Sequence, residues 1–270
     1  MRPRFVLLAA LAASTLDSAP LCAQTASTST PGLFTRNDAI LAAGFAGLTV
    51  AMFPLDKSLA RILTNRVSRT NKFLNKAATG VEVITDPGSL VIGAVLYTYG
   101  RAAHKGNMEA LGWHGTESVI LAGGTTWILK SLAGRARPYV SKDTSPADFQ
   151  LLGGFGNGDR QSFPSGHTTT AFAAASAVTS EARIIWPGHT WFVGPAMYGG
   201  ATLVGLSRMY HDKHWASDVV LGAAIGTFAG IKVIRYTHEH PDNRVDRAII
   251  KDKVTGVRIP VATFRIPLSF

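Results

Sequence analysis

The chain has 270 residues, which is enough for one sizeable domain with short appendages. Hydrophobic residues make up 46% of it and charged residues only 16%, against about 25% in typical soluble domains. This composition argues against an ordinary soluble surface and favours a membrane bundle or a very buried helical core. The net charge of +10 suits anionic partners such as phosphate esters and lipid headgroups, whereas no recognition motif for nucleic acid is present. The single cysteine, Cys22, excludes an internal disulfide framework and a cysteine-based metal cluster.

The N-terminus predicts an export signal. An apolar run, Phe5–Ala13, follows two arginines and has the length of a signal peptide rather than of a membrane span. We assign residues 1–23 to a leader and residues 24–36 to a flexible segment. We therefore expect a protein of a bacterial-type cell envelope, at the inner membrane, with a soluble periplasmic protein as the alternative.

Six apolar stretches predict helices of three to five turns, separated by proline, glycine and polar residues. They cover Ala39–Phe53, Ser89–Gly100, Thr116–Leu132, Thr168–Ala182, Trp191–Leu206 and Asp218–Ile234. Their short connections predict an all-α bundle over residues 37–235. Each stretch is slightly shorter than the ~20 residues that a membrane span needs, but flanking residues can extend it. We favour a membrane-embedded bundle and leave its topology open.

Three other segments have less certain patterns. Leu55–Lys76 alternates apolar and basic residues at helical spacing, which is typical of a helix on an anionic membrane surface or of an ordinary solvated helix. The glycine-rich stretch Gly153–Asp159 lacks the spacing and the lysine of a phosphate-binding loop, so we interpret it as a flexible lid or connector. The polar, basic tail, residues 236–270, ends in a partly alternating pattern that predicts an irregular or β-like structure.

Charged and histidine residues gather where the predicted helices begin or end. Lys130 and Arg137 follow the third helix, Ser165, Gly166 and His167 open the fourth, and Arg208, His214 and Asp218 lie between the fifth and the sixth. In an up-and-down bundle these three junctions lie at the same end. The spacing therefore predicts one site built from three segments.

These residue types suit phosphoryl transfer. Guanidinium and ammonium groups neutralise the transferred phosphoryl group, and a helix N-terminus adds N–H donors. If the helix starts near His214, Asp218 shares its face and can accept the Nδ1–H of the imidazole, which leaves Nε2 free to attack phosphorus. A second histidine, His167, can protonate the leaving alkoxide.

The patterns K-x6-RP, PSGH and SR-x5-H-x3-D, in this order, resemble the three signature motifs of the type 2 phosphatidic acid phosphatase superfamily. That group contains membrane lipid phosphatases, soluble bacterial acid phosphatases and vanadium haloperoxidases. The match spans Lys130–Asp218 and is complete at every signature position. The resemblance implies His214 as the nucleophile, Asp218 as its orienting partner and His167 as the general acid. It also implies a set of phosphate ligands: Lys130, Arg137, Ser165, Gly166 and Arg208.

We thus expect a phosphatase, without metal or cofactor, that hydrolyses a phosphate monoester or diphosphate of a lipid, of the phosphatidate or isoprenyl diphosphate type, through a phosphohistidine. An exported acid phosphatase acting on soluble esters, a vanadate-dependent haloperoxidase and a non-enzymatic bundle that binds anionic headgroups remain alternatives. A metal site at His211, His214 and Asp218 is disfavoured by the surrounding positive charge. We interpret the remaining histidines as surface or structural: His104, His114, His189, His238 and His240. The oligomeric state stays open.

Overall fold

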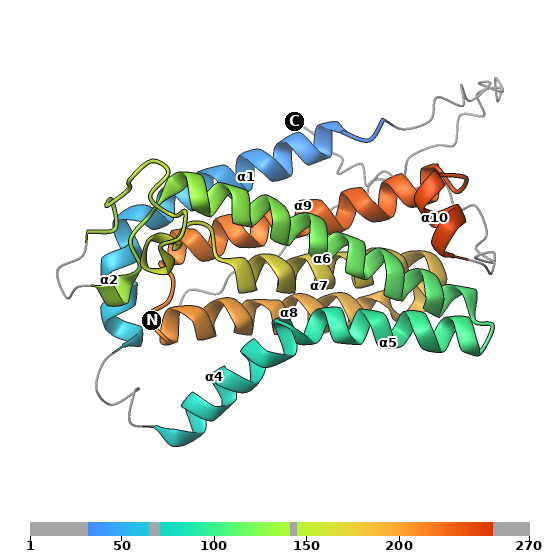
Figure 1. Ribbon diagram of the computed structural model, residues 1–270, viewed down its shortest axis with the longest axis horizontal. Helices are drawn as coiled ribbons and strands as arrows, with labels where there is room; N and C mark the ends of the chain where they lie inside the picture. Colours follow the sequence, from blue (N-terminus) through green and yellow to red (C-terminus); the bar gives the residue numbers. More distant parts are fainter. Residues whose placement is uncertain (1–31, 65–70, 141–144, 251–270) are drawn as a thin grey trace, which may run out of the picture. The chain divides into compact units, whose positions relative to one another are not determined.

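The computed structural model describes residues 32–64, 71–140 and 145–250, and over these residues the regular structure is entirely helical (Figure 1). The expected leader and the β-like end of the tail lie outside the described residues. The long elements are α1 (Arg36–Met52), α4 (Lys72–Thr85), α5 (Gly88–Ala102), α6 (Gly106–Ala133), α7 (Gly166–Ile185), α8 (Thr190–Tyr210) and α9 (Ala216–Glu239). The shorter ones are η1 (Phe53–Leu55), α2 (Asp56–Leu63), η2 (Pro138–Val140), η3 (Gly158–Arg160), η4 (Pro187–His189) and α10 (Arg244–Ile249).

All six predicted apolar helices are present, and each is longer than the apolar stretch that predicted it. The largest extension is in α6, which begins at Gly106 instead of Thr116. Its first turns contain Glu109 and His114, which are polar in sequence but buried among neighbouring helices in the fold. The first part of the predicted tail is also helical, because α9 continues to Glu239 and α10 follows it.

The prediction of one amphipathic helix over Leu55–Lys76 is wrong. The segment contains the end of α2 at Leu63 and a new helix, α4, that starts at Lys72. The side chain of Asn71 accepts hydrogen bonds from the N–H groups of Phe73 and Leu74, which is the capping that begins a helix. At the start of α2, Asp56 is fully buried and pairs with Arg135.

The centre of the bundle is the contact between α7 and α9, which α1, α6 and α8 surround. Their axes approach closely because α9 has glycine at every fourth position facing α7: Gly222, Gly226 and Gly230. A Cβ atom at Gly226 would lie 2.2 Å from the carbonyl oxygen of Thr169. Packing through small residues is typical of helices in membranes, where van der Waals contact rather than hydrophobic burial holds helices together.

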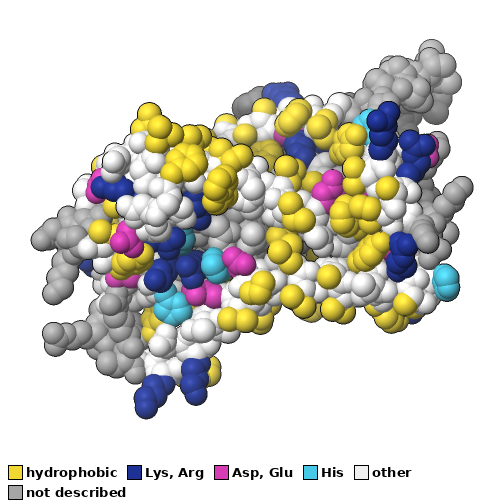
Figure 2. All heavy atoms as spheres, in the orientation of Figure 1, with side chains coloured by type: hydrophobic (Ala, Val, Ile, Leu, Met, Phe, Trp, Pro, Cys, Tyr) yellow, Lys and Arg dark blue, Asp and Glu magenta, His cyan; other side chains and the backbone are white. Residues whose placement is uncertain are grey.

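The outer surface has the composition expected for contact with lipid. Large apolar side chains on the outer faces of α1, α5, α6 and α8 are exposed, among them Val50, Val95, Ile120 and Trp191. Figure 2 shows hydrophobic side chains over the middle of one face and charged ones mainly towards its two ends. Two helical segments, Arg36–Leu63 and Ala216–Glu239, are long and apolar enough to cross a membrane, and α4 with α5, bent by 47°, can form a third span. The fold is that of a membrane protein.

Candidate active site

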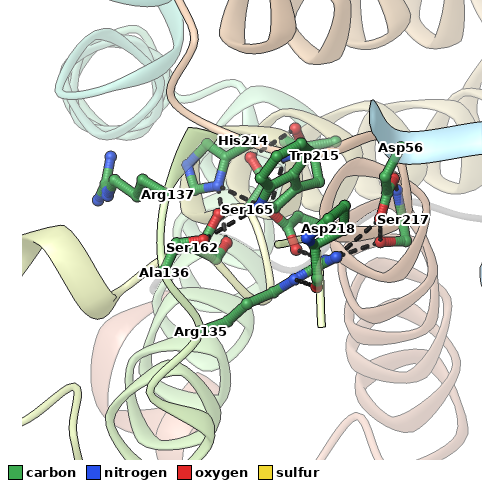
Figure 3. Close-up of polar contacts among 12 residues, drawn as sticks. Asp56, Arg135, Ala136, Arg137, Ser162, Ser165, His214, Trp215, Ser217 and Asp218 are labelled. Carbon is green, nitrogen blue, oxygen red and sulfur yellow. Dashed lines mark hydrogen bonds and ion pairs between the residues drawn. The ribbon is translucent and has the colours of Figure 1, made fainter. Parts of the chain in front are cut away.

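The end of α6, the start of α7 and the connection between α8 and α9 meet at one end of the bundle, as the sequence predicted. Gly134 ends α6 in the left-handed conformation, with φ +57°, and turns the chain towards Arg135. A Cβ atom on Gly166 would lie 3.2 Å from the Nζ atom of Lys130, so the first two segments touch. The backbone N–H of Ser165 donates to the carbonyl of Asp218, at 3.0 Å, which joins the second segment to the third. Figure 3 shows this convergence.

His214 is buried, with only 3% of its surface exposed, and its Nδ1 atom lies 2.7 Å from the backbone carbonyl of Ser162. The predicted hydrogen bond to Asp218 is absent, since the nearer carboxylate oxygen is 3.7 Å from Nδ1. The reason is that α9 begins at Ala216, so His214 precedes the helix and does not share a helical face with Asp218. The predicted tautomer of His214 is nevertheless the same. A carbonyl oxygen can only accept a hydrogen bond, so the proton lies on Nδ1 and Nε2 keeps a free lone pair.

Burial lowers the pKa of His214 to about 3; the charges of Arg137 and Lys130 contribute to this shift, and Asp218 opposes it. The imidazole is therefore neutral at pH 7, the state that a nucleophile needs.

Asp218 organises the segments around His214. Its carboxylate, fully buried, accepts hydrogen bonds from the Ser162 hydroxyl at 2.5 Å and from the Trp215 N–H at 2.7 Å, and it pairs with Arg135. Since the carbonyl of Ser162 holds the imidazole, Asp218 orients His214 through Ser162 rather than by direct contact.

Arg135 was missed by sequence reasoning, which singled out only Arg137 in the stretch GRARPY. Its guanidinium is fully buried and bridges Asp218 to Asp56 at 2.7 Å, while it also donates to the hydroxyl of Ser217. The aromatic rings of Phe53, Phe149, Phe163 and Trp215 surround it at 4.8–5.6 Å. The spacing K-x6-RP identifies Arg137 but does not reveal that Arg135 is buried, because its partner Asp56 belongs to α2, which is distant in sequence.

Lys130 lies near two other predicted cations, Arg137 and Arg208, whose charges act on it. Burial is the main cause that lowers the pKa of Lys130 to about 8, and these two charges contribute to the shift. The Nε atom of Arg137 donates to the carbonyl of Gly158 at 2.8 Å, so the glycine-rich connector holds this side chain in place. Three adjacent positive charges repel one another, and a bound anion relieves that repulsion.

Arg208 is nine-tenths buried and pairs at 2.6 Å with Glu82, a residue of α4 that sequence reasoning did not identify. Its Nε atom has no hydrogen-bond partner in the described part of the chain. Glu82 also lies 2.8 Å from Nδ1 of His211, whose Nε2 atom is 2.9 Å from the side-chain oxygen of Asn75. Both nitrogens of His211 thus face α4, and the alternative metal site with His214 and Asp218 is not assembled.

At the start of α7 the predicted ligands differ in accessibility. Ser165 is fully buried, its hydroxyl lies 2.8 Å from that of Thr168, and its N–H is already used by Asp218. His167 is partly exposed, and its Nδ1 atom lies 3.9 Å from the carboxylate of Asp86, which the sequence did not identify as part of the site either. Burial, followed by the charge of Arg208, lowers the pKa of His167 to about 4, while Asp86 opposes the shift.

A neutral imidazole thus lies beside clustered cations at one end of a helical membrane bundle. The profile of the PAP2 superfamily matches residues 112–242, which include all the residues predicted for the site. Over residues 112–242 the chain is therefore similar to the PAP2 superfamily.

Three curated proteins are similar to parts of the chain. The chain is 31% identical over 150 residues to a lipid A 1-phosphatase of Rhizobium etli, covering 51% of this chain and 60% of that protein. It is 31% identical over 147 residues to one of Rhizobium johnstonii, covering 50% and 55%. It is 45% identical over 69 residues to one of Porphyromonas gingivalis, covering 26% of this chain and 15% of that protein. The chain thus spans 60% or less of the length of these relatives.

The fold resembles the crystal structure of a transmembrane PAP2-type phosphatidylglycerolphosphate phosphatase from Bacillus subtilis, with a TM-score of 0.52 and 20% identity. The match covers 78% of this chain and 99% of that one.

Proposed function

We propose that the protein is a metal-independent phosphatase that removes a phosphate group from a membrane lipid, with His214 as the nucleophile. The observation that carries the proposal is the state of His214: buried, neutral, and bonded through Nδ1 to a backbone carbonyl, next to Lys130 and Arg137. The lone pair on Nε2 of His214 is therefore available next to Lys130 and Arg137, whose positive charges favour a bound anion.

The proposed reaction has two steps. Nε2 of His214 attacks phosphorus, the bond from phosphorus to the lipid oxygen breaks, and His167 gives its proton to that oxygen. Water then attacks the phosphohistidine, its proton passes to His167, the P–N bond breaks, and inorganic phosphate and free His214 are regenerated. Lys130, Arg137 and Arg208 neutralise the phosphoryl oxygens in both steps, and the N–H of Gly166 adds a donor.

The general acid must be protonated, although the pKa of His167 in the free protein is about 4. The charge of Arg208 is one cause of that low value, and a phosphate dianion bound to the cations offsets it. Asp86, 3.9 Å away, acts in the same direction. We infer that His167 takes up its proton when the substrate binds.

The substrate is proposed to be a lipid with a phosphorylated sugar headgroup, as the names of the curated relatives suggest. An open pocket of about 320 Å³, whose lining includes residues close in sequence to Arg137 and Arg208, supports a polar headgroup. It is lined by Asn75, Tyr139, Tyr210, His211, Asp212 and Lys213. Aromatic rings combined with polar side chains can stack on a sugar and hydrogen-bond to its hydroxyls. The exposed apolar faces of the bundle would keep the acyl chains in lipid, and a bacterial inner membrane is the proposed location.

The test is phosphate release by the purified protein in detergent and excess chelator. The panel consists of a glycolipid 1-phosphate, phosphatidate, an isoprenyl diphosphate and a soluble aryl phosphate. We expect the first to have the highest kcat/KM, and we expect His214→Ala to lose activity on every substrate. His189→Ala, an exposed histidine of η4, serves as the matched control. A preference for the soluble ester would overturn the lipid assignment, and vanadate-dependent halide oxidation would favour the haloperoxidase alternative.

A further inference from the structure

A second cluster of ionisable groups lies at the other end of the bundle from the candidate active site. It contains His114 of α6, Glu181 of α7 and His238 of α9. Asp218 and His238 are separated by twenty residues of the same helix, which places the two clusters about 30 Å apart. The proposed phosphatase reaction uses none of these three residues.

The three side chains converge. One ligand atom from each lies within 4.8 Å of the others. Nδ1 of His114 is 2.7 Å from one carboxylate oxygen of Glu181, and Nε2 of His238 is 3.0 Å from the other oxygen. Glu181 is fully buried and His114 is 3% exposed, so the cluster belongs to the helix interfaces and not to a solvated surface.

Buried polar atoms without partners surround this cluster. Nε2 of His114 lies 3.4 Å from Oδ2 of Asp246 and makes no hydrogen bond within the described residues. Oδ1 of Asp246 and Oε2 of Glu117 are likewise buried without a partner in the described ranges. Unpaired buried polar atoms are costly, which indicates that the site is built to hold something more than these side chains.

The position of Asp246 suggests what that is. A histidine that binds a metal through one ring nitrogen usually donates its other N–H to a carboxylate, which fixes the tautomer. Here Nδ1 of His114 faces Glu181 and Nε2 faces Asp246. Asp246 is held in turn by the side chain of Asn243 at 2.6 Å.

The distances fit a tetrahedral ion after small adjustments. Zinc bound to nitrogen and oxygen at about 2.0–2.1 Å separates its ligand atoms by roughly 3.3 Å. The distances from Glu181 to His114, 2.7 Å, and to His238, 3.0 Å, are shorter than this separation. Shorter distances are expected where hydrogen bonds take the place of an ion. Two imidazoles and one carboxylate are a donor set that suits zinc better than calcium or magnesium, which prefer oxygen alone.

We propose that His114, Glu181 and His238 bind one zinc-type divalent cation, with Asp246 accepting the Nε2–H of His114. The ion joins α6, α7 and α9 at the end of the bundle remote from the cations of the active site, and through Asp246 it fixes α10. Its role is structural, and it does not depend on the proposed phosphatase function.

The test uses the full chain, purified in detergent with its affinity tag removed and stripped with chelator. Titration with Co²⁺ at pH 7.5 should give the visible absorption of a tetrahedral site at one ion per chain, and Zn²⁺ should displace it. His238→Ala should lose this signal, while His189→Ala, an exposed histidine outside the cluster, should bind as the wild type does. Asp246→Asn should retain the site with affinity about 10–100-fold lower.

Binding of Co²⁺ by His238→Ala equal to that of the wild type, or no binding by the wild type, would overturn the proposal. If His238→Ala does not fold, Glu181→Gln should lose the signal in its place, and Asp246→Asn should show the lower affinity; wild-type affinity in both variants would overturn the proposal. His214→Ala should bind the ion normally, and the stripped wild type should still release phosphate. Failure of the metal site and failure of the proposed phosphatase are therefore distinguishable.

Discussion

Replacing Asp56 by alanine tests whether the buried charges behind the site hold the fold together. The Asp56 carboxylate accepts hydrogen bonds from Arg135 at 2.7 Å and from the N–H and hydroxyl of Ser217 at 2.9 and 2.6 Å. All three residues are fully buried, and of its two carboxylate partners Arg135 would keep only Asp218. Breaking a buried pair costs about 3–5 kcal/mol, a large share of the ~5–15 kcal/mol that stabilises a typical protein.

For a domain of this size, that loss corresponds to a fall in Tm of roughly 6–20 °C. Thermal unfolding in detergent, followed by circular dichroism, measures it. The matched control is Asp148→Ala, which removes an ion pair with Arg160 that is 40% exposed on the Asp148 side. An exposed pair contributes at most about 1 kcal/mol, or up to ~4 °C in Tm. Equal shifts for the two variants would refute the view that Asp56, Arg135 and Asp218 form the structural support of the site.

Three further predictions concern the site itself. Gly166→Ala should fold normally but lose at least ten-fold in kcat/KM. The new Cβ would lie 3.2 Å from Nζ of Lys130 and would displace that mobile ammonium. Unchanged kinetics would contradict this prediction. Glu82→Gln should strengthen inhibition by inorganic phosphate up to about five-fold. The Glu82 carboxylate competes with phosphate for Arg208, and the substitution removes its negative charge. Weaker inhibition would contradict this and would mean that Glu82 positions the arginine. Burial holds the pKa of His214 at about 3 in the folded protein, whereas the pKa in the unfolded chain is near 6.5. The neutral ring therefore favours folding fully above pH 6.5, and this contribution to stability is lost as the pH falls from 6.5 towards 3. His214→Gln should reduce this loss by about 1.4 kcal/mol per pH unit, measured as Tm between pH 6.5 and 4.5; parallel pH profiles for both proteins would contradict it.

The helices could be predicted because their signal is local. Each apolar stretch is bounded by proline, glycine or capping residues, and those features act over a few residues. The meeting of the three junctions followed from the same information, since antiparallel neighbours place alternate helix ends together. The glycines of α9 that allow close contact with α7 are regularly spaced, but only the structure shows which helix they face.

The contacts that depend on distant segments could not be predicted. Whether Asp218 touches His214 depends on where α9 begins, and its start at Ala216 leaves the imidazole to the carbonyl of Ser162. Arg135 and Arg137 have similar sequence environments, yet only the first meets Asp56. Glu181 is distant in sequence from both His114 and His238, and it becomes their common partner only when three helices pack.

The most direct test of the proposed mechanism is to trap the covalent intermediate. Wild-type protein mixed with a ³²P-labelled substrate and quenched within milliseconds should carry label on His214, identified by peptide mapping, in the presence of chelator. His214→Ala should carry none, and the His189→Ala control should be labelled as the wild type is. Undiminished labelling or turnover of His214→Ala would contradict the assignment of His214 as the nucleophile.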